Sequence, residues 1–132
     1  MNYIKTYESY SNQEILDTIS DILLDAKDEG LDADVEELTG TSSAWASSMS
    51  GYKEYRIIIQ KNKGIRNLFF NYEDIRDVMD RSLQYLNINR IEHQPIQIYD
   101  GRWYPFDKEY DSWQQQASNY RVKAAKILFR LK

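Results

Sequence analysis

Cysteine is absent from this chain. Its absence excludes disulfide bonds, thiolate zinc sites and cysteine nucleophiles, although it does not decide the cellular compartment. Long apolar runs are also absent, because no stretch approaches the roughly 20 apolar residues of a membrane span. The opening, MNYIKTYESY, lacks the apolar core of a signal peptide. We therefore expect a cytoplasmic protein that does not interact with a membrane.

Motifs for common chemistries are absent as well. The sequence has no zinc signature and no glycine-rich phosphate loop. Ser50 and Lys53 have the S-x-x-K spacing of a serine nucleophile and its base, but no companion motif follows them. Catalysis needs a nucleophile, a base and an oxyanion site together. We therefore predict a protein that is not an enzyme and that uses no cofactor or metal.

The composition is that of one folded domain. The chain has 132 residues, of which 42% are hydrophobic and 14% aromatic. This length is typical of a single domain with one modest core, and disordered chains contain far fewer aromatic residues. We predict a single domain over residues 1–132.

Two helices are predicted from apolar periodicity and capping residues. In the first, Ser11 is the expected N-cap and Gly30 the expected stop. Its apolar face is expected to contain Ile15, Ile19, Ile22 and Ala26, at spacings of four, three and four. In the second, Asn71 is the expected N-cap and the helix continues to about residue 87. Its apolar face is expected to contain Ile75, Val78, Met79, Ser82, Leu83 and Leu86.

Alternating apolar residues predict strands within residues 31–38 and 52–61, with the serine-rich stretch as their connection if the two strands pair. A hairpin is predicted over residues 95–105, because Asp100-Gly101 suits a type I′ turn. In that register Ile98 lies opposite Trp103.

The C-terminal segment has two periodicities. A stripe from Trp113 to Leu131 fits a helix, whereas Ile127, Phe129 and Leu131 alternate as in a strand. We predict a helix over residues 111–125 and leave the last residues open. The whole pattern indicates an α+β fold in which two or three helices pack on one face of a small, mostly antiparallel sheet.

The charges are distributed unevenly along the chain. Residues 1–40 contain eleven acids and two bases, and residues 41–132 contain ten acids and fifteen bases, so the net charges are −9 and +5. One interpretation is that the acidic and basic parts lie against each other in the fold. The other is a dipolar surface that attracts a charged partner.

Two features are candidates for binding another protein. Asp17, Asp21, Asp25 and Asp28 recur at spacings of four, four and three, so they form a carboxylate stripe on the solvent side of the first helix. Trp45 lies in the uncharged stretch GTSSAWASSMSGY, and tryptophan is enriched at interface hot spots. An ordinary polar helix face and a tryptophan folded back onto the sheet are the alternatives.

An alternative function is nucleic-acid binding by the basic C-terminal segment. The last twelve residues contain five bases and no acid. Such cations contact phosphates, and nearby aromatic rings stack on bases. The candidate residues are Arg121, Lys123, Lys126, Arg130 and Lys132.

The first residues resemble the start of many small proteins of tailed bacteriophages. The matching residues are Met1, Tyr3, Ile4, Lys5, Tyr7 and Glu8. The resemblance implies viral origin and the cytoplasm of a bacterial host, and it transfers no site residue. Our first hypothesis is a small non-enzymatic accessory protein of this type that binds another protein, of unknown identity, through Trp45 and the aspartate stripe. A structural component of the virion is a further alternative.

Overall fold

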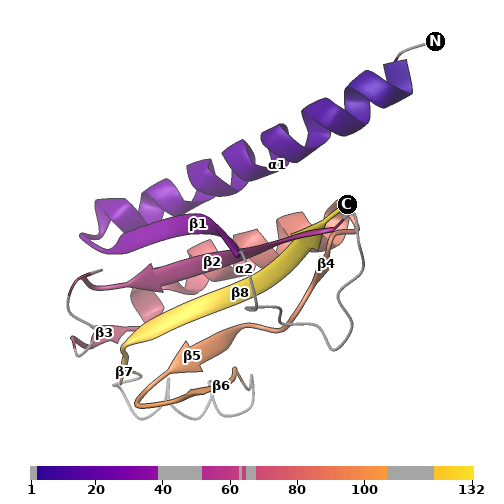
Figure 1. Cartoon of the computed structure of the whole chain (residues 1–132). Coiled ribbons are helices and arrows are strands. Elements are labelled where there is room, and N and C mark those ends of the chain that lie inside the picture. The colour runs from indigo at the N-terminus through magenta and orange to yellow at the C-terminus, as the bar shows by residue number, and fades with distance from the viewer. Residues whose placement is uncertain (1–2, 39–51, 63, 65–67, 107–120) are drawn as a thin grey trace.

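The structure is a computed structural model that describes residues 3–38, 52–62, 64, 68–106 and 121–132 (Figure 1). Its helices are α1 (Tyr3–Asp28) and α2 (Glu73–Ile88). Its longer strands are β1 (Asp32–Leu38), β2 (Lys53–Gln60) and β8 (Ala124–Leu131). The short strands are β3 (Phe70–Asn71), β4 (Glu92–His93), β5 (Gln97–Tyr99), β6 (Trp103–Pro105) and β7 (Arg121–Val122).

The main sheet of the described residues is antiparallel and has the strand order β1-β2-β8-β5-β6. β4 also pairs with β8, alongside β5. β3 and β7 form a separate two-stranded sheet. The C-terminal strand β8 is therefore central, with partners on both of its edges.

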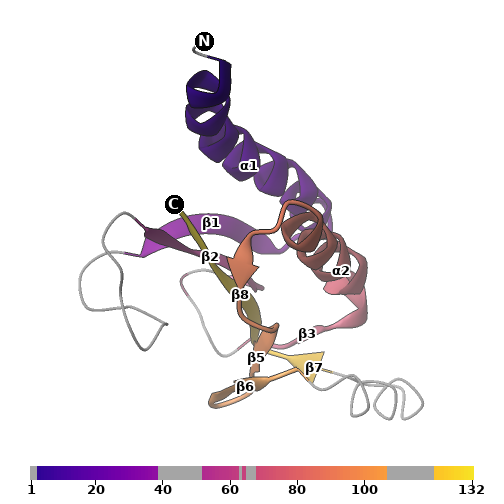
Figure 2. The ribbon, with the colours of Figure 1, turned by 90° about the vertical axis from the view of Figure 1, so that its right-hand side faces the viewer.

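Both helices lie on the same side of the sheet, as the two views together show (Figures 1 and 2). The core lies between them and the sheet. Ile19 and Leu23 of α1 and Met79 of α2 are fully buried there. From the sheet, Ile57 and Phe129 face them and are also fully buried. The predicted α+β class is thus confirmed, with two helices on one face of a mostly antiparallel sheet.

The two helices end in the same backbone motif. After α1, Gly30 N–H donates to the Lys27 carbonyl and Leu31 N–H to the Ala26 carbonyl, and Gly30 has a φ of +83°. These two bonds form a Schellman motif, which closes a helix with a left-handed residue. The predicted stop at Gly30 is confirmed.

After α2, Arg90 N–H donates to the Asn87 carbonyl and Ile91 N–H to the Leu86 carbonyl. Here the left-handed residue is Arg90, with a φ of +54°.

Both predicted helix starts are wrong. α1 already begins at Tyr3, so Ser11 lies inside the helix and does not cap it. α2 begins one residue later than predicted, because Asn71 pairs with Arg121 in the β3–β7 sheet. Tyr72 is its N-cap, and it makes no side-chain capping hydrogen bond. The start of α2 is therefore set by the pairing of β3 with β7, which depends on residues distant in the sequence.

The first two strands are confirmed. β1 and β2 pair antiparallel, with Ala33 opposite Ile59 and Val35 opposite Ile57. The serine-rich stretch connects them, as predicted. Its residues 39–51, including Trp45, lie outside the described part of the chain.

The predicted hairpin register is wrong by one residue. Tyr99 lies opposite Trp103, and Ile98 lies opposite Tyr104. The turn therefore has three residues, with Gly101 at a φ of +87°. Because side chains alternate across a strand, the shift moves Trp103 away from the buried Ile98 to the face that the helices leave open.

The helix predicted over residues 111–125 is wrong where it can be compared with the structure. Residues 121–122 and 124–125 are strand, and residues 111–120 lie outside the described part. Residues 124–131 form β8. This strand includes the last residues of the chain, for which the sequence leaves both helix and strand open. Its core-facing residues Ala125, Ile127 and Phe129 are fully buried. The ladder from Lys53↔Leu131 to Gln60↔Ala124 satisfies the backbone of β8, which explains why the strand periodicity prevails over the helical one.

Candidate functional site

The acidic stripe on α1 exists as a set of exposed carboxylates. Asp17, Asp21, Asp25 and Asp28 are all exposed in the structure. The opposite side of the helix contributes Ile15, Ile19, Leu23 and Ala26 to the core. Among the described residues, no cationic group lies within ion-pair distance of Asp17, Asp21 or Asp28. Asp17 accepts a hydrogen bond of 2.9 Å from the Gln13 amide on the same helix.

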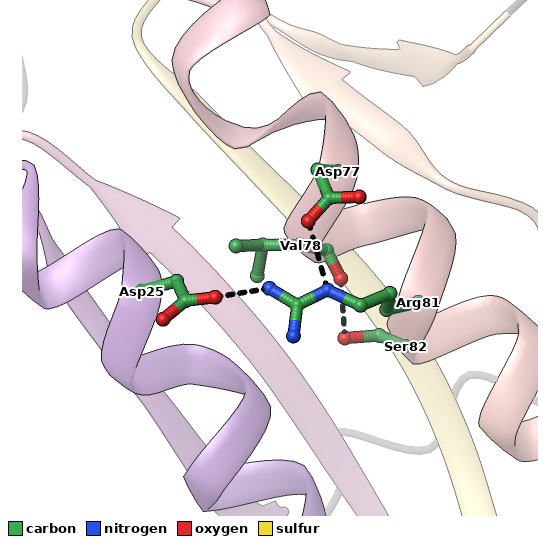
Figure 3. Close-up of polar contacts among 5 residues, drawn as sticks. All are labelled: Asp25, Asp77, Val78, Arg81 and Ser82. Atoms are coloured by element: carbon green, nitrogen blue, oxygen red, sulfur yellow. Dashed lines mark hydrogen bonds and ion pairs between the residues drawn. The ribbon is translucent and has the colours of Figure 1, made fainter.

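Asp25 differs from the rest of the stripe because it is paired across the helix interface. Its carboxylate accepts a hydrogen bond from Arg81 Nη2 of α2 (Figure 3). Arg81 Nε also donates to Asp77 Oδ2 at 2.9 Å. The hydrogen bond with Asp25 is the largest cause that raises the pKa of Arg81, burial opposes it, and the charge of Asp77 raises the pKa further. Three of the four predicted carboxylates therefore remain open to a partner.

The five predicted C-terminal bases do not form one continuous patch. Lys126 and Arg130 alternate with the core residues of β8, so they lie on the open face of the sheet. Arg121 and Lys123 lie over the Phe69 ring, at 5.5 and 4.9 Å from its centroid. Lys132 is exposed at the end of the chain, where its carbonyl accepts a hydrogen bond from Asn12.

Aromatic rings already contact the two bases on the open face. Lys126 Nζ lies 4.0 Å from the centroid of the Trp103 ring. The guanidinium carbon of Arg130 lies 4.5 Å from the Tyr52 centroid, and Arg130 also forms an ion pair with Glu92. Each such cation–aromatic contact contributes about 0.5–2 kcal/mol. These contacts hold the cations in place on the sheet.

The charge on the open face of the sheet changes sign from one strand to the next. On β1 the side chains of this face include Asp32, Asp34 and Glu36, which register opposite Gln60, Ile58 and Arg56 of β2. On the other side of β2, Ile58 registers opposite Lys126 of β8. Arg56 forms a 2.6 Å ion pair with Glu36. Glu36 of the acidic first third of the chain thus pairs with a cation from the rest of the chain, in line with one interpretation of the charge asymmetry.

A hollow of about 50 Å³ lies on this open face, between the ends of β2, β8 and the β5–β6 hairpin. Its cations are Arg56 and Lys123. The remaining lining residues are Ile58, Gln60, Tyr99, Trp103 and Ala124, so the lining includes no acid. Sequence analysis missed Arg56, although its position between the core residues Tyr55 and Ile57 of a strand places it on the opposite face.

Two electrostatic features mark the surroundings of this hollow. The Nε atom of Arg56 is buried and has no hydrogen-bond partner among the described residues. The pKa of Lys126 is lowered, first by burial and then by repulsion from Arg56. Both features describe positive charge that is partly removed from water and incompletely compensated.

A second hollow, of about 310 Å³, lies where α1 ends near β3 and β7. Its charged lining residues are Glu29, Asp74, Lys61 and Arg121. Equal numbers of acids and bases give this hollow no preference for a ligand of either sign.

His93, the single histidine of the chain, lies in the short strand β4 that follows α2. Its Nδ1 lies 3.0 Å from the Gln94 carbonyl, and its Nε2 lies 2.7 Å from Asn87 Oδ1. Both ring nitrogens are occupied by contacts within the chain. This arrangement fits a structural role for the ring.

Within the described ranges, no three acidic or histidine side chains gather closely enough to hold a metal ion. In the same ranges, neither helix has a stretch long and apolar enough to cross a bilayer. Trp45, the remaining predicted contact residue, lies outside these ranges. No protein-family model matches the chain, and neither curated proteins nor solved structures give a significant match.

Proposed function

We propose that this chain is a non-enzymatic accessory protein, of the phage type that its first residues resemble, and that it acts by binding another protein. The observation that supports this proposal is the set of open carboxylates on α1. Asp17, Asp21 and Asp28 are exposed on one helix, and no cation of the described residues compensates them. The complementary partner surface is basic, because complementary charge steers association.

The shape of α1 also supports this proposal. The N-terminal end of the helix extends beyond the sheet in both views (Figures 1 and 2). Asn12, which contacts the C-terminal carbonyl at 3.1 Å, marks the point where the helix passes the end of the chain. The aspartate stripe follows this point, on the part of α1 that packs on the sheet, so a partner would contact its exposed carboxylates from the solvent side of the helix.

Affinity capture from a bacterial host lysate, with and without nuclease, tests this proposal. The bait is the whole chain, and the triple variant Asp17→Asn/Asp21→Asn/Asp28→Asn is compared with a control, Asp74→Asn/Asp80→Asn/Asp100→Asn. Both variants remove three exposed carboxylates, so they change the net charge equally. We expect a nuclease-resistant protein partner that the stripe variant loses and the control retains. A Trp45→Ala variant tests the predicted contact of the serine-rich stretch in the same assay.

Equal capture by both triple variants would contradict the proposed role of the stripe. Capture that collapses on nuclease treatment would favour the alternative, in which the basic C-terminal residues bind nucleic acid. Self-association of the purified chain, measured by sedimentation, would favour a structural component of the virion.

A further inference from the structure

We propose that the hollow lined by Arg56 and Lys123 is a binding site for the phosphate group of a nucleotide. This site lies on the sheet face opposite the helices and uses none of the α1 carboxylates. It is therefore independent of the proposed protein-binding surface.

The first argument is the sign of the charge at the hollow. Arg56 comes from β2, and Lys123 comes from the bend between β7 and β8. Lys126 lies beside them, over the Trp103 ring. Glu36 compensates one amino group of Arg56 from outside the lining. The lining itself contains two cations and no acid, while the carboxylates of this face, Asp34 and Glu36 among them, lie on the neighbouring strand β1. An anion in the hollow would relieve the repulsion between Arg56 and Lys126.

The second argument is the set of hydrogen-bond donors. Because Arg56 Nη2 is bonded to Glu36, its guanidinium is held in one orientation, while its buried Nε–H has no partner among the described residues. A buried unpaired donor costs about 1–3 kcal/mol, so a shift of the guanidinium that exposes this N–H to an acceptor oxygen in the hollow would be favoured. Gln60, Tyr99 and Lys123 also line the hollow, and each of these residue types carries hydrogen-bond donors.

The size and the rim of the hollow indicate the kind of anion. A hollow of about 50 Å³ suits a compact oxyanion. Phosphate offers several acceptor oxygens and a charge of about −1.5 to −2 at neutral pH, more than a carboxylate does. The rings of Tyr99 and Trp103, with centroids 5.2 Å apart, provide an aromatic surface at the same place. An aromatic surface beside a phosphate site suits a nucleotide, whose base can lie against it.

The test is a titration of the whole, isotope-labelled chain followed by NMR at constant ionic strength. The probes are inorganic phosphate, adenosine 5′-monophosphate and a short single-stranded oligonucleotide, with acetate as the carboxylate control. We expect saturable shifts of the Arg56 Nε–H signal and of the amides of Ile58, Gln60 and Ala124. Acetate should produce no saturable shift at these signals. The phosphate carrier with the lowest Kd identifies the source of the phosphate group.

Matched variants make the test specific. Arg56→Gln/Lys123→Gln removes both lining cations, and Lys53→Gln/Arg90→Gln removes two exposed cations elsewhere. We expect the first variant to weaken phosphate binding about tenfold or more, since each charge-assisted hydrogen bond contributes about a factor of ten. We expect the second to leave binding unchanged. Lys123→Gln alone, which keeps the Arg56–Glu36 pair, covers the case in which the double variant fails to fold.

Three results would overturn the proposal. The first is the absence of a saturable shift with any phosphate probe. The second is equal weakening by the two double variants, which would indicate general charge attraction. The third is acetate binding as tight as phosphate binding. None of these results depends on whether the α1 stripe binds a protein, because the stripe variants do not alter the lining of the hollow.

Discussion

Gly30 and Arg90 occupy the same position, one after each helix, with φ angles of +83° and +54°. Each closes its helix through the same pair of backbone hydrogen bonds. A non-glycine residue in this conformation costs roughly 1–2 kcal/mol, because its Cβ approaches the following carbonyl oxygen. The end of α2 is therefore strained relative to the end of α1.

We expect Arg90→Gly to raise the free energy of unfolding by about 0.5–1 kcal/mol and Gly30→Ala to lower it by about 1 kcal/mol. A Cβ at Gly30 would meet no atom within 4 Å, so the cost there is backbone strain alone. Urea denaturation measures both changes. A destabilised Arg90→Gly variant would show that the arginine side chain contributes more than its backbone conformation costs.

We expect Asp25→Asn to destabilise the protein by about 0.5 kcal/mol at low salt, because exposed ion pairs contribute up to about 1 kcal/mol. The pair links α1 to α2, but 59% of the Asp25 side chain and 38% of the Arg81 side chain are exposed. Asp21→Asn is the matched control, since Asp21 has no ion pair among the described residues. The difference between the variants should disappear near 1 M salt, where screening is strong. Identical stabilities at low salt would contradict a contribution of this pair.

We expect Ser82→Ala to change the free energy of unfolding by no more than about 0.5 kcal/mol, in the stabilising direction, because alanine has the higher helix propensity. Ser82 is fully buried, and its hydroxyl donates to the Val78 carbonyl at 2.8 Å (Figure 3). Removing the hydroxyl leaves no buried group unpaired, since that carbonyl keeps its backbone bond in the helix.

Met79→Ala is the contrasting variant on the same helix. Met79 is fully buried, and its truncation should cost about 2–5 kcal/mol through the cavity it leaves. Thermal denaturation of both variants measures the contrast. A loss of more than 1 kcal/mol in Ser82→Ala, on the scale of a buried hydrogen bond, would contradict this account.

Stability should fall as the pH rises above about 10, the ordinary tyrosine pKa. Burial, and then the charge of Glu37, raise the pKa of Tyr55. The folded chain therefore keeps this proton at a pH where the unfolded chain has lost it. The stabilisation that Tyr55 provides is fully present below the pKa of this tyrosine in the unfolded chain. It is lost as the pH rises through its pKa in the folded chain. Denaturation of Tyr55→Phe between pH 8 and 11 should show a weaker decline than the natural sequence, and an equal decline would contradict the assignment.

The sequence alone determined the features that depend on neighbours in the chain. The buried face of α1 follows from the spacing of Ile15, Ile19 and Ala26, and its end follows from Gly30, because helix geometry and φ preference act over a few residues. The alternation of Tyr55, Ile57 and Ile59 likewise identified β2 and its buried face. The exposure of the aspartate stripe follows from the same periodicity.

Tertiary structure decided what depends on partners distant in the chain. The last residues carry both a helical and a strand periodicity, and pairing with β2 and β5 selects the strand because it satisfies the backbone of a buried segment. The hairpin register follows from placing Ile98 in the core. Asp25 is ion-paired, unlike the other three aspartates of the stripe, because Arg81, 56 residues away in the sequence, contacts it from α2. Arg56 and Lys123 likewise line one hollow only because β2 and β8 are neighbours, and no local pattern encodes that distance.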